Sequence, residues 1–476
     1  MAEEKNVLLR LENAKMHFPL KKDNIFQKER PCVKAVDGVT IDIYEGETLG
    51  LVGESGCGKT TLGRVILQLY HQTEGSVHYR GITLNDYAPN YAFHDVAKIS
   101  RMKKLSAEEI IELYPNQAKI AGGTLLYNDL SVVAHAYKDN LHAVKEVNRL
   151  ETIIKLLEIR RVALVESVAN TEKGLQKIES NIERLKIILK KAEEERDKCA
   201  LAIDELLPEC RQKPGYEELE EVRDISIDLS RLTKEEMRRQ RRHLQIIFQD
   251  PYSSLNHRFT VGQIISEALV AHKMYKRGTK QLEEYTLSVM DQCGLQNYFL
   301  HRYPHQFSGG QRQRIGIARA LAPQPKFIVC DEAVSALDVS IQSQIINLLM
   351  DLKEGSNLTY LFISHDLSTV KFISDRVGVM YLGNIIELGN SDEIFKRPLH
   401  PYTNVLLKAI PTTDEASKKE LQVIEGDIPS PVNPPSGCKF HTRCEFVKDI
   451  CKNEVPEWRE MYPKHWVACH FPVMES

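Results

Sequence analysis

A glycine-rich stretch between a predicted strand and a predicted helix constrains the fold of this chain more than any other feature. Residues 53–60 read Gly-Glu-Ser-Gly-Cys-Gly-Lys-Thr, the pattern G-x-x-x-x-G-K-T. The apolar run 48–52 predicts a buried strand before it, and residues 61–67 predict a helix after it. In this context the loop wraps phosphate groups with its backbone N–H donors. The sequence therefore predicts an α/β domain that binds a nucleotide.

Two side chains of this loop have the chemistry to act on phosphates directly. The Lys59 ammonium would reach the outer phosphates, and the Thr60 hydroxyl would bind the accompanying Mg²⁺ ion. The remaining residues of the cradle would act through backbone N–H groups and the positive end of the following helix. They are Gly53, Glu54, Ser55, Gly56, Cys57, Gly58 and Thr61.

Length and composition limit the broad class of the protein. A chain of 476 residues is long enough for two or three modules. With 42% hydrophobic and 27% charged residues it has the composition of a soluble globular protein, and its net charge of −3 does not favour nucleic acid as a partner. No apolar run approaches the roughly 18 residues that a membrane span needs, and residues 1–6 do not resemble a signal peptide. We therefore expect a cytosolic protein whose ten cysteines form no disulfide framework.

A second part of the nucleotide site is predicted far along the chain. Residues 327–332, Phe-Ile-Val-Cys-Asp-Glu, read as a buried parallel strand that ends in two acids. Asp331 would hold Mg²⁺, directly or through water. Glu332 would orient and polarise the attacking water, because phosphoryl transfer depends mainly on positioning and charge stabilisation.

A second phosphate cradle lies between these two motifs. Ser308, Gly309, Gly310 and Gln311 open a predicted helix and offer backbone N–H groups to an anion. One nucleotide does not need two cradles from one subunit. We therefore expect this second cradle to serve a nucleotide bound to another subunit.

These motifs resemble those of the ATP-binding subunits of ABC transporters. Residues 307–311, Phe-Ser-Gly-Gly-Gln, resemble the LSGGQ signature of that family, and residues 335–338 resemble its D-loop, which ends at Asp338. The resemblance implies ATP and Mg²⁺ as cofactors. It also implies a head-to-tail pair of ATPase subunits, in which the signature of each subunit covers the ATP of the other.

The same resemblance assigns roles to three further side chains. Gln249 is similar to the Q-loop glutamine, which implies contact with Mg²⁺ and with the membrane subunit. His365 resembles the switch histidine that contacts the γ-phosphate, and Phe18 is placed where an aromatic ring stacks on adenine. The family commonly has proline after the glutamate, whereas this chain has Ala333. Because both acids are present, we expect hydrolysis to be retained.

Other segments resemble one branch of the family, the di- and oligopeptide importers. They are residues 34–39, 305–314, 400–403 and 426–438. Within this branch the chain is most similar to the F-type ATPase subunit, which pairs with a D-type ATPase. The resemblance covers residues 7–84 and 234–472. It implies two integral-membrane permease subunits, an extracytoplasmic solute-binding protein as an indirect partner, and a peripheral position on the cytoplasmic face of the cell membrane.

Three other functions remain open at the level of sequence. Related ATPases serve importers of nickel or other small solutes. ABC proteins of DNA repair also carry a coiled-coil arm, although the tail and the Pro-Tyr-Thr segment at 401–403 argue against that class. An ATPase-inactive regulatory partner is the third alternative, and the presence of Glu332, Gln249 and His365 argues against it.

Four cysteines close to the C-terminus predict a metal site. Cys438, Cys444, Cys451 and Cys469 have the spacing C-x5-C-x6-C-x17-C within a Pro-rich tail that has few strand signals. Four thiolates can hold zinc or an iron–sulfur cluster. Structural zinc sites usually contain closely spaced cysteine pairs, and the wider spacing in this tail favours a cluster. The peptide importers have a C-terminal four-cysteine motif associated with a 4Fe-4S cluster, which these residues resemble; zinc and unligated thiols remain alternatives.

About 150 residues separate the strand near residues 75–81 from the segment that leads to Gln249, where the fold ordinarily has a short connection. From Val147 to Leu206 apolar residues recur at three- and four-residue spacing, which predicts a coiled-coil seam. One continuous helix would extend roughly 90 Å at 1.5 Å per residue and would need a partner chain. We favour an antiparallel hairpin with helices at about 139–168 and 175–206 and a turn at 169–174, because the chain must return to where it left. Capping boxes are predicted at 106–109 and 233–236.

The expected fold is α/β, an ABC-type ATPase domain with a mixed core sheet and a helical subdomain that carries the signature. Residues 1–87 form the first part of the core and 88–232 the inserted coiled-coil hairpin. Residues 233–410 carry the Q-loop, signature, acidic strand and switch, and 411–476 form a small cysteine-ligated domain. The inserted segment is either a docking arm for another subunit or an insertion without an essential role.

Overall fold

The computed structural model describes residues 6–21, 30–166, 172–408 and 427–473. The contacts cluster into two compact units. The core unit comprises Met1–Val77, Gln240–Ala268 and Tyr285–Ser476, and the inserted unit comprises His78–Arg239 and Leu269–Glu284. None of the described helices is both long and apolar enough to cross a membrane.

The core unit is built on a mixed eight-stranded sheet with the order β11-β12-β10-β9-β3-β8-β7-β6. Its parallel part contains β3 (Thr48–Val52), β6 (Leu244–Ile247), β7 (Phe327–Asp331), β8 (Thr359–Ile363) and β9 (Arg376–Tyr381). Every residue of β3, β7 and β8 is buried, as expected for parallel strands that are covered on both faces. The mixed α/β sheet predicted from the sequence is confirmed.

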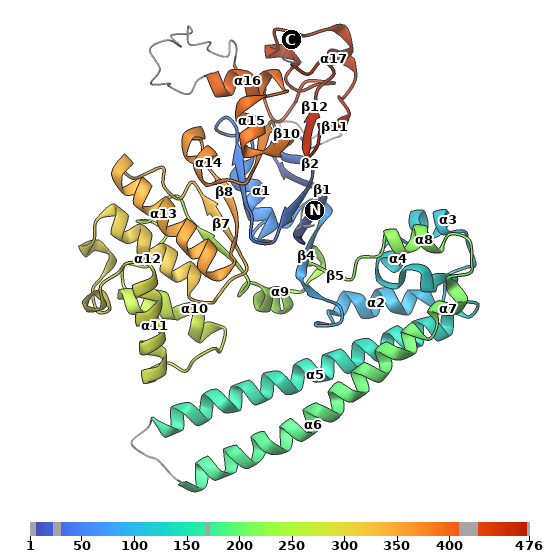
Figure 1. Cartoon of the computed structure of the whole chain (residues 1–476), viewed down its shortest axis with the longest axis vertical. Helices are drawn as coiled ribbons and strands as arrows, with labels where there is room; N and C mark the ends of the chain where they lie inside the picture. The colour runs from blue at the N-terminus through green and yellow to red at the C-terminus, as the bar shows by residue number, and fades with distance from the viewer. Residues whose placement is uncertain (1–5, 22–29, 167–171, 409–426, 474–476) are drawn as a thin grey trace. The chain divides into compact units, whose positions relative to one another are not determined.

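The carboxyl ends of β3, β6, β7 and β8 meet at one edge of this sheet, because the four strands are parallel neighbours. The phosphate loop follows β3, and the two acids stand at the end of β7. Helices surround the sheet (Figure 1), and those that lie in or reach into the core unit are α1 (Lys59–Ile66), α10 (Val261–Ala271), α11 (Lys280–Gln292), α12 (Gly309–Leu321), α13 (Val339–Ser356), α14 (Leu367–Ile373), α15 (Ser391–Lys396), α16 (Pro401–Lys408) and α17 (Asp449–Asn453).

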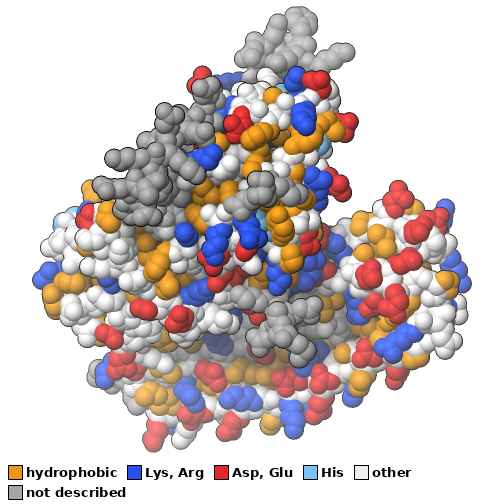
Figure 2. Space-filling view, turned by 45° about the horizontal axis from the view of Figure 1, so that its top comes forward, with side chains coloured by type: hydrophobic (Ala, Val, Ile, Leu, Met, Phe, Trp, Pro, Cys, Tyr) orange, Lys and Arg blue, Asp and Glu red, His pale blue; other side chains and the backbone are white. Residues whose placement is uncertain are grey.

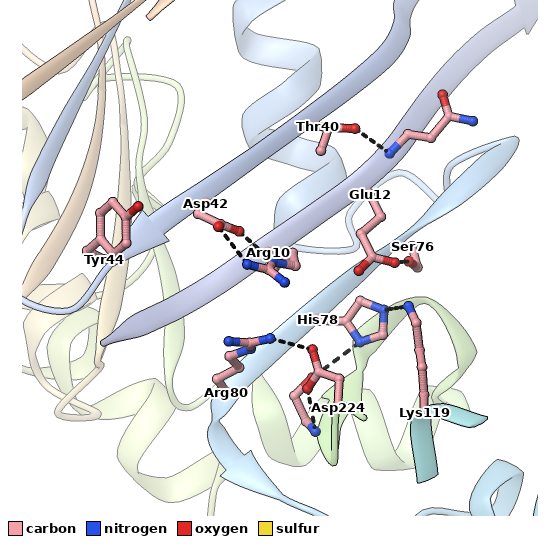
Figure 3. A network of polar contacts seen from close by, with 12 residues as sticks. Arg10, Glu12, Thr40, Asp42, Tyr44, Ser76, His78, Arg80, Lys119 and Asp224 are labelled. Carbon is pink, nitrogen blue, oxygen red and sulfur yellow. Dashed lines mark hydrogen bonds and ion pairs between the residues drawn. The ribbon is translucent and has the colours of Figure 1, made fainter. Parts of the chain in front are cut away.

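Two long antiparallel strands, β1 (Val7–Pro19) and β2 (Cys32–Tyr44), complete the core unit. Across this pair the Arg10 guanidinium binds both carboxylate oxygens of Asp42 at 2.7 Å (Figure 3). The planar, two-point geometry fixes the position of β1 relative to β2, and the opposite charges also attract each other.

The C-terminal region extends the main sheet, contrary to the prediction of a tail with few strands. Strands β11 (Trp458–Tyr462) and β12 (His465–Ala468) form an antiparallel hairpin, and β12 pairs with β10 (Asn384–Asn390). Fully buried Glu387 on β10 accepts hydrogen bonds from the backbone of Leu399 and His400 and lies 2.8 Å from His465 Nε2. This buried network joins the tail to the core, which local sequence patterns do not reveal.

The inserted unit begins in β4 (Glu74–Thr83), which pairs antiparallel with β5 (Ser226–Asp228) where the inserted chain returns. Buried His78 lies 3.1 Å from Lys119 Nζ and 3.2 Å from Ser226 Oγ (Figure 3). Because an ammonium can only donate, Nε2 of His78 is the acceptor, and Nδ1–H donates to Ser226. Arg80 binds Asp224 at 2.7 Å. These polar contacts therefore hold together the start of the inserted unit at β4 and its return near β5.

Short helices frame the inserted unit: α2 (Asn90–Ile99), α3 (Ala107–Leu113), α4 (Pro115–Ala121), α7 (Leu207–Cys210), α8 (Tyr216–Glu221) and α9 (Lys234–Gln240). The predicted capping boxes are both present. Ser106 and Glu109 exchange hydrogen bonds at the start of α3, and Thr233 and Glu236 do so at the start of α9.

Two long helices, α5 (Leu130–Val165) and α6 (Glu172–Asp204), pack against each other in opposite directions (Figure 1). This helical hairpin holds a seam of Ile154, Ile178 and Ile182, flanked by partly buried Leu157, Leu164, Leu185 and Leu189. The predicted bounds were too short at one end: α5 begins at Leu130, where the Asp129 side chain caps it. The turn was also misplaced, because residues 172–174 are already helical, while Val168 and residues 169–171 lie outside the described residues.

Candidate functional site

The backbone of the phosphate loop adopts conformations that require glycine. Gly53, Gly56 and Gly58 have φ of +148°, +82° and +108°. A Cβ atom at Gly58 would lie 2.0 Å from the Ala35 carbonyl oxygen, and one at Gly53 would lie 2.2 Å from that of Met380. Both contacts are with backbone, which cannot give way. Neighbouring backbone therefore packs closely against the wrapped loop, and only glycine fits at these positions.

Lys59, the first residue of α1, is folded back onto this loop. Its ammonium donates to the carbonyl oxygens of Gly53 at 2.7 Å and Glu54 at 3.0 Å, and only 5% of the residue is exposed. It also lies 3.7 Å from the Cys57 sulfur, a buried thiol whose pKa is raised mainly by burial. The lysine is thus oriented across the mouth of the loop by neutral acceptors, which phosphate oxygens can replace.

The predicted magnesium residues are brought together. Thr60 Oγ1 donates to Asp331 Oδ1 at 2.6 Å, joining the start of α1 to the end of β7. Asp331 is 3% exposed, and burial raises the pKa of its carboxyl, opposed by the Thr60 hydrogen bond and by Arg64, whose Nη2 lies 3.9 Å from Oδ2. A hydroxyl beside a carboxylate is an oxygen donor set that suits Mg²⁺.

The predicted catalytic residues converge on one carboxylate oxygen. Glu332 Oε2 accepts a hydrogen bond from Gln249 Nε2 at 2.7 Å and lies 3.4 Å from His365 Nδ1. Glu332 has φ of +47°, a left-handed conformation that is uncommon for a glutamate, and its backbone N–H donates to Ile363 at the end of β8. The strained backbone turns the side chain from β7 toward the Q-loop and switch residues. Three separate segments therefore meet at Glu332.

The signature residues form the start of α12. Ser308 is its N-cap and shares a capping box with Gln311. A Cβ at Gly310 would lie 2.5 Å from Ile341 Cγ2, so the signature packs against α13, whose N-cap is Asp338. Hydrogen bonds from Ile341 N–H and Ser340 hold the pKa of Asp338 below its ordinary value. Signature and D-loop thus lie together, and the described contacts of these residues do not reach the phosphate loop.

Phe18, predicted to stack on adenine, lies on β1 and is partly buried. Its ring meets Tyr70 edge to face at 5.4 Å, and Tyr70 Oη accepts a hydrogen bond from Arg64. Phe18 is therefore linked to the Asp331 side of the site through two side chains. Ser55 lies in the phosphate loop, and Thr61 lies in the first turn of α1.

Two residues that contact the phosphate loop were not predicted. The Tyr402 hydroxyl accepts a hydrogen bond from Glu54 N–H at 2.8 Å, and Arg443 binds both carboxylate oxygens of Glu54 at 2.8 and 3.0 Å. Tyr402 lies in the segment 400–403 that resembled the peptide importers, which was its only signal. Arg443 had none, since an arginine between two cysteines does not reveal a partner nearly 400 residues away.

The four C-terminal cysteines line one pocket of about 10 Å³. Burial raises the pKa of the Cys438 and Cys444 thiols, and it raises that of Cys469 to about 12. Backbone N–H groups two residues further on point to each of these three sulfurs. Among the described residues, however, no three His, Cys, Asp or Glu side chains are arranged to hold a metal ion. The four cysteines therefore share a pocket, as predicted, but their described side chains do not form a metal-binding group.

A cavity of about 490 Å³ lies between β2 and the C-terminal region and is lined by Asp37, Cys438, Lys439 and Trp458 among others. Lys439 Nζ is held there by Asp37 and by the Leu382 carbonyl. The cavity shares no lining residue with the phosphate loop, so we do not place the nucleotide in it.

Comparison with known proteins agrees with this geometry. The family described as ABC transporter matches residues 36–175 and 217–335, more than half of the chain. The chain belongs to the ABC transporter family. The family described as oligopeptide/dipeptide transporter, C-terminal region, matches residues 386–451. With the nucleotide site described above, this ABC protein is an ATPase.

Individual relatives differ in how much of the chain they cover. "Oligopeptide transport ATP-binding protein AppF" of Bacillus subtilis is 36% identical over 472 residues, 98% of each chain. "Putative peptide import ATP-binding protein BOV_A0347" of Brucella ovis is 53% identical over 243 residues, 51% of this chain and 76% of its own. Among solved structures, cbiO1 from Clostridium perfringens is 16% identical with a TM-score of 0.42, covering 82% of this chain and 91% of its own. The family assignment rests on the sequence matches.

Proposed function

We propose that this chain is the ATP-hydrolysing subunit of an ABC importer for dipeptides or oligopeptides. The observation that carries the proposal is the match of residues 386–451 to the C-terminal region of oligopeptide/dipeptide transporters. That region reaches the nucleotide site directly, because Tyr402 and Arg443 both bind Glu54 of the phosphate loop. The names of the relatives, which describe peptide transport, add support.

ATP would bind in the cradle of residues 53–61. Its phosphates would draw the Lys59 ammonium from the carbonyls of Gly53 and Glu54, which hold it ready in the loop. Thr60, Asp331 and Gln249 would hold Mg²⁺, which neutralises charge on the phosphates when bound. Phe18 would stack on the adenine ring.

Glu332 would act as the base that orients the attacking water. Its carboxylate is already oriented by Gln249 and faces His365, which would contact the γ-phosphate. In this arrangement the two side chains set the direction of the carboxylate, and the carboxylate holds the water in line with the phosphorus atom.

Each site would be completed by a second ATPase subunit. Ser308, Gly309, Gly310, Gln311 and Asp338 lie together on α12 and α13, so they are free to face a nucleotide on a partner. We propose that this chain is the F-type member of a pair with a D-type ATPase. The pair would lie on the cytoplasmic face of the cell membrane, bound to two permease subunits, with a solute-binding protein on the other side.

Replacing Glu332 by Gln tests the assignment of the base. The Glu332→Gln chain should bind ATP as tightly as the wild type while its turnover falls by about 100-fold or more. The exposed Glu354→Gln change on α13 is a matched control and should leave both quantities unchanged. Wild-type turnover in the Glu332→Gln chain would refute the role, and a chain that purifies with no integral-membrane partner would argue against transport.

A 4Fe-4S cluster on Cys438, Cys444, Cys451 and Cys469 is part of the proposal, with zinc as the alternative. The support is that the four thiols line one pocket and that backbone N–H groups point to three of the sulfurs. Anaerobic purification followed by iron, sulfide and zinc assays distinguishes the two. A colourless, iron-free protein with one zinc per chain would refute the cluster.

We propose that the chain divides as 1–87, 88–232, 233–410 and 411–476, and that residues 88–232 are a coiled-coil arm which docks another subunit. The match to AppF leaves only about 2% of either chain uncovered, so that relative also has residues aligned with the arm. This makes an insertion peculiar to the present chain a weaker explanation. Deletion of residues 88–230 should impair assembly or uptake, and unimpaired uptake would show that the arm is dispensable.

A further inference from the structure

The phosphate loop of this chain contains an acidic side chain. Glu54 is the second residue of a loop that must wrap several negatively charged phosphates. A carboxylate next to a triphosphate repels it, and the repulsion is strong where the surroundings are partly shielded from water. Glu54 is 22% exposed, so solvent screens it only in part. An unpaired charge at this position would oppose nucleotide binding.

Arg443 pairs with this carboxylate from the C-terminal region. Its two terminal nitrogens bind the two oxygens of Glu54 at 2.8 and 3.0 Å, the planar two-point arrangement that gives arginine–carboxylate pairs their strength. The Arg443 side chain is 4% exposed, and Nη1 also lies 3.4 Å from the Tyr381 hydroxyl. The hydrogen bond to Glu54 is the main reason that the pKa of Arg443 is raised.

The segment that carries Arg443 is itself anchored. Phe440 is 2% exposed and packs against the rings of Tyr381, Tyr402 and His400. Neighbouring Lys439 binds Asp37 on β2. The packing of Phe440 and the Lys439–Asp37 contact therefore hold the Arg443 guanidinium next to the loop. Tyr402, which packs against Phe440, accepts a hydrogen bond from the backbone N–H of Glu54.

The ion pair between Arg443 and Glu54 contributes little to the stability of the fold. Removing two charges from water offsets most of their mutual attraction, so a buried pair is weak evidence of stabilisation. In addition, Nε of Arg443 is buried without a hydrogen-bond partner among the described residues. The consequence of the pair lies instead in the charge and direction of the Glu54 side chain.

We propose that Arg443 is a positioning residue for nucleotide binding, which neutralises Glu54 and holds its carboxylate away from the triphosphate. The C-terminal region thereby contributes to ATP affinity across nearly 400 residues of sequence. The inference rests on ATP binding at residues 53–61, and it does not depend on which solute the transporter carries.

A double-mutant cycle on the full-length chain tests the proposal, with the dissociation constant of Mg-ATP as the readout. Arg443→Ala should weaken binding by about 10- to 100-fold, because it leaves Glu54 unpaired beside the phosphates. Glu54→Gln should have a smaller effect. The double variant should bind ATP within about threefold of Glu54→Gln, since removal of the carboxylate makes the guanidinium unnecessary.

Two further variants separate charge from structure. Arg443→Lys keeps the positive charge and should recover most of the affinity lost in Arg443→Ala. Arg459→Ala is the matched control, because Arg459 binds the Cys469 carbonyl within the C-terminal region; its ATP affinity should match the wild type. Adenosine, which has no phosphates, should bind Arg443→Ala and wild type equally.

Three results would overturn the proposal: unchanged ATP affinity in Arg443→Ala, a double variant as weak as Arg443→Ala, or an equal loss in Arg459→Ala. The last two would mean that Arg443 only supports the fold. A failure of peptide uptake by the wild-type transporter would refute the proposed substrate and leave this inference standing, because ATP affinity is measured separately.

Discussion

The nucleotide site and the helical hairpin are specified in opposite ways. At the site, the side chains of Gln249 and His365 meet on Glu332, which directly follows β7, and the loop backbone requires glycine at fixed points. The hairpin instead depends on an apolar repeat, and only Ile178, Ile182 and Ile203 of α6 are buried. Acidic and basic side chains are interspersed on the molecular face shown in Figure 2. Contacts between single atoms therefore determine the site, whereas the summed burial of apolar side chains determines the hairpin.

Removal of the Lys59 ammonium should produce the largest effect and act on the site alone. Lys59→Ala loses charge-assisted hydrogen bonds to the phosphates, each worth about 1.5–3 kcal/mol, so the loss of two such bonds should lower ATP affinity by about 1,000-fold. Binding titrations would measure this, with exposed Lys98→Ala in the inserted unit as the control. Equal ATP affinity in Lys59→Ala would contradict the assignment of the loop.

Truncation in the seam should act on the hairpin alone. Ile182 is 4% exposed, so Ile182→Ala should cost about 2–4 kcal/mol of local stability. Hydrogen exchange of the α5 and α6 amides would report it, while ATP affinity should not change. Ile187 is 63% exposed on the same helix, and Ile187→Ala should cost under about 0.5 kcal/mol. Similar losses in both variants would mean that the seam does not hold the hairpin.

Loss of the Gln249 side chain, which orients Glu332, should have an intermediate effect. It should lower the ATPase rate while nucleotide affinity changes little. Gln249→Ala removes the 2.7 Å hydrogen bond to Glu332 and should lower the ATPase rate by about 10-fold, roughly 1.4 kcal/mol. The dissociation constant for nucleotide in the absence of Mg²⁺ should change little. A loss confined to binding would show that Gln249 holds the ligand rather than the base.

The smallest effect is expected at a helix start in the inserted unit. Thr233→Ala breaks the capping box of α9 and should destabilise that helix by about 1 kcal/mol. Thr152→Ala, within α5, removes a threonine without a capping role and should not destabilise its helix. Faster hydrogen exchange in α9 for the first variant only would agree with this expectation.

Local patterns were sufficient for most of the site. The strand before the phosphate loop, the strand ending at Asp331 and the helix after Ser308 were all predicted, because short apolar runs and helix caps act within a few residues. The pairing of Thr60 with Asp331 follows once β3 and β7 are parallel strands of one sheet, separated by β8 alone. The roles of Thr60 and Asp331 were inferred from the chemistry of the two motifs, whereas those of Gln249, His365 and Phe18 came from the family resemblance. All of these roles remain proposals.

Features that depend on distant contacts could not be read from the sequence. The hairpin β11–β12 was missed because its place is set by β10 and by buried Glu387, not by its own alternation. Arg443 was missed because its partner, Glu54, belongs to another part of the chain. In the helical hairpin, the seam residues were predicted, but the start of α5 at Leu130 was not, since a period of 3.6 residues does not mark where a helix begins.

ATP-driven peptide uptake would show whether this chain powers an importer. The transporter purified with this chain would be placed in lipid vesicles, and entry of a labelled oligopeptide would be measured with ATP on the side of this subunit. We expect uptake with the wild-type chain and its loss with Glu332→Gln, in which ATP stays bound. Undiminished uptake with Glu332→Gln, or a wild-type transporter that hydrolyses ATP and carries no peptide, would contradict this expectation.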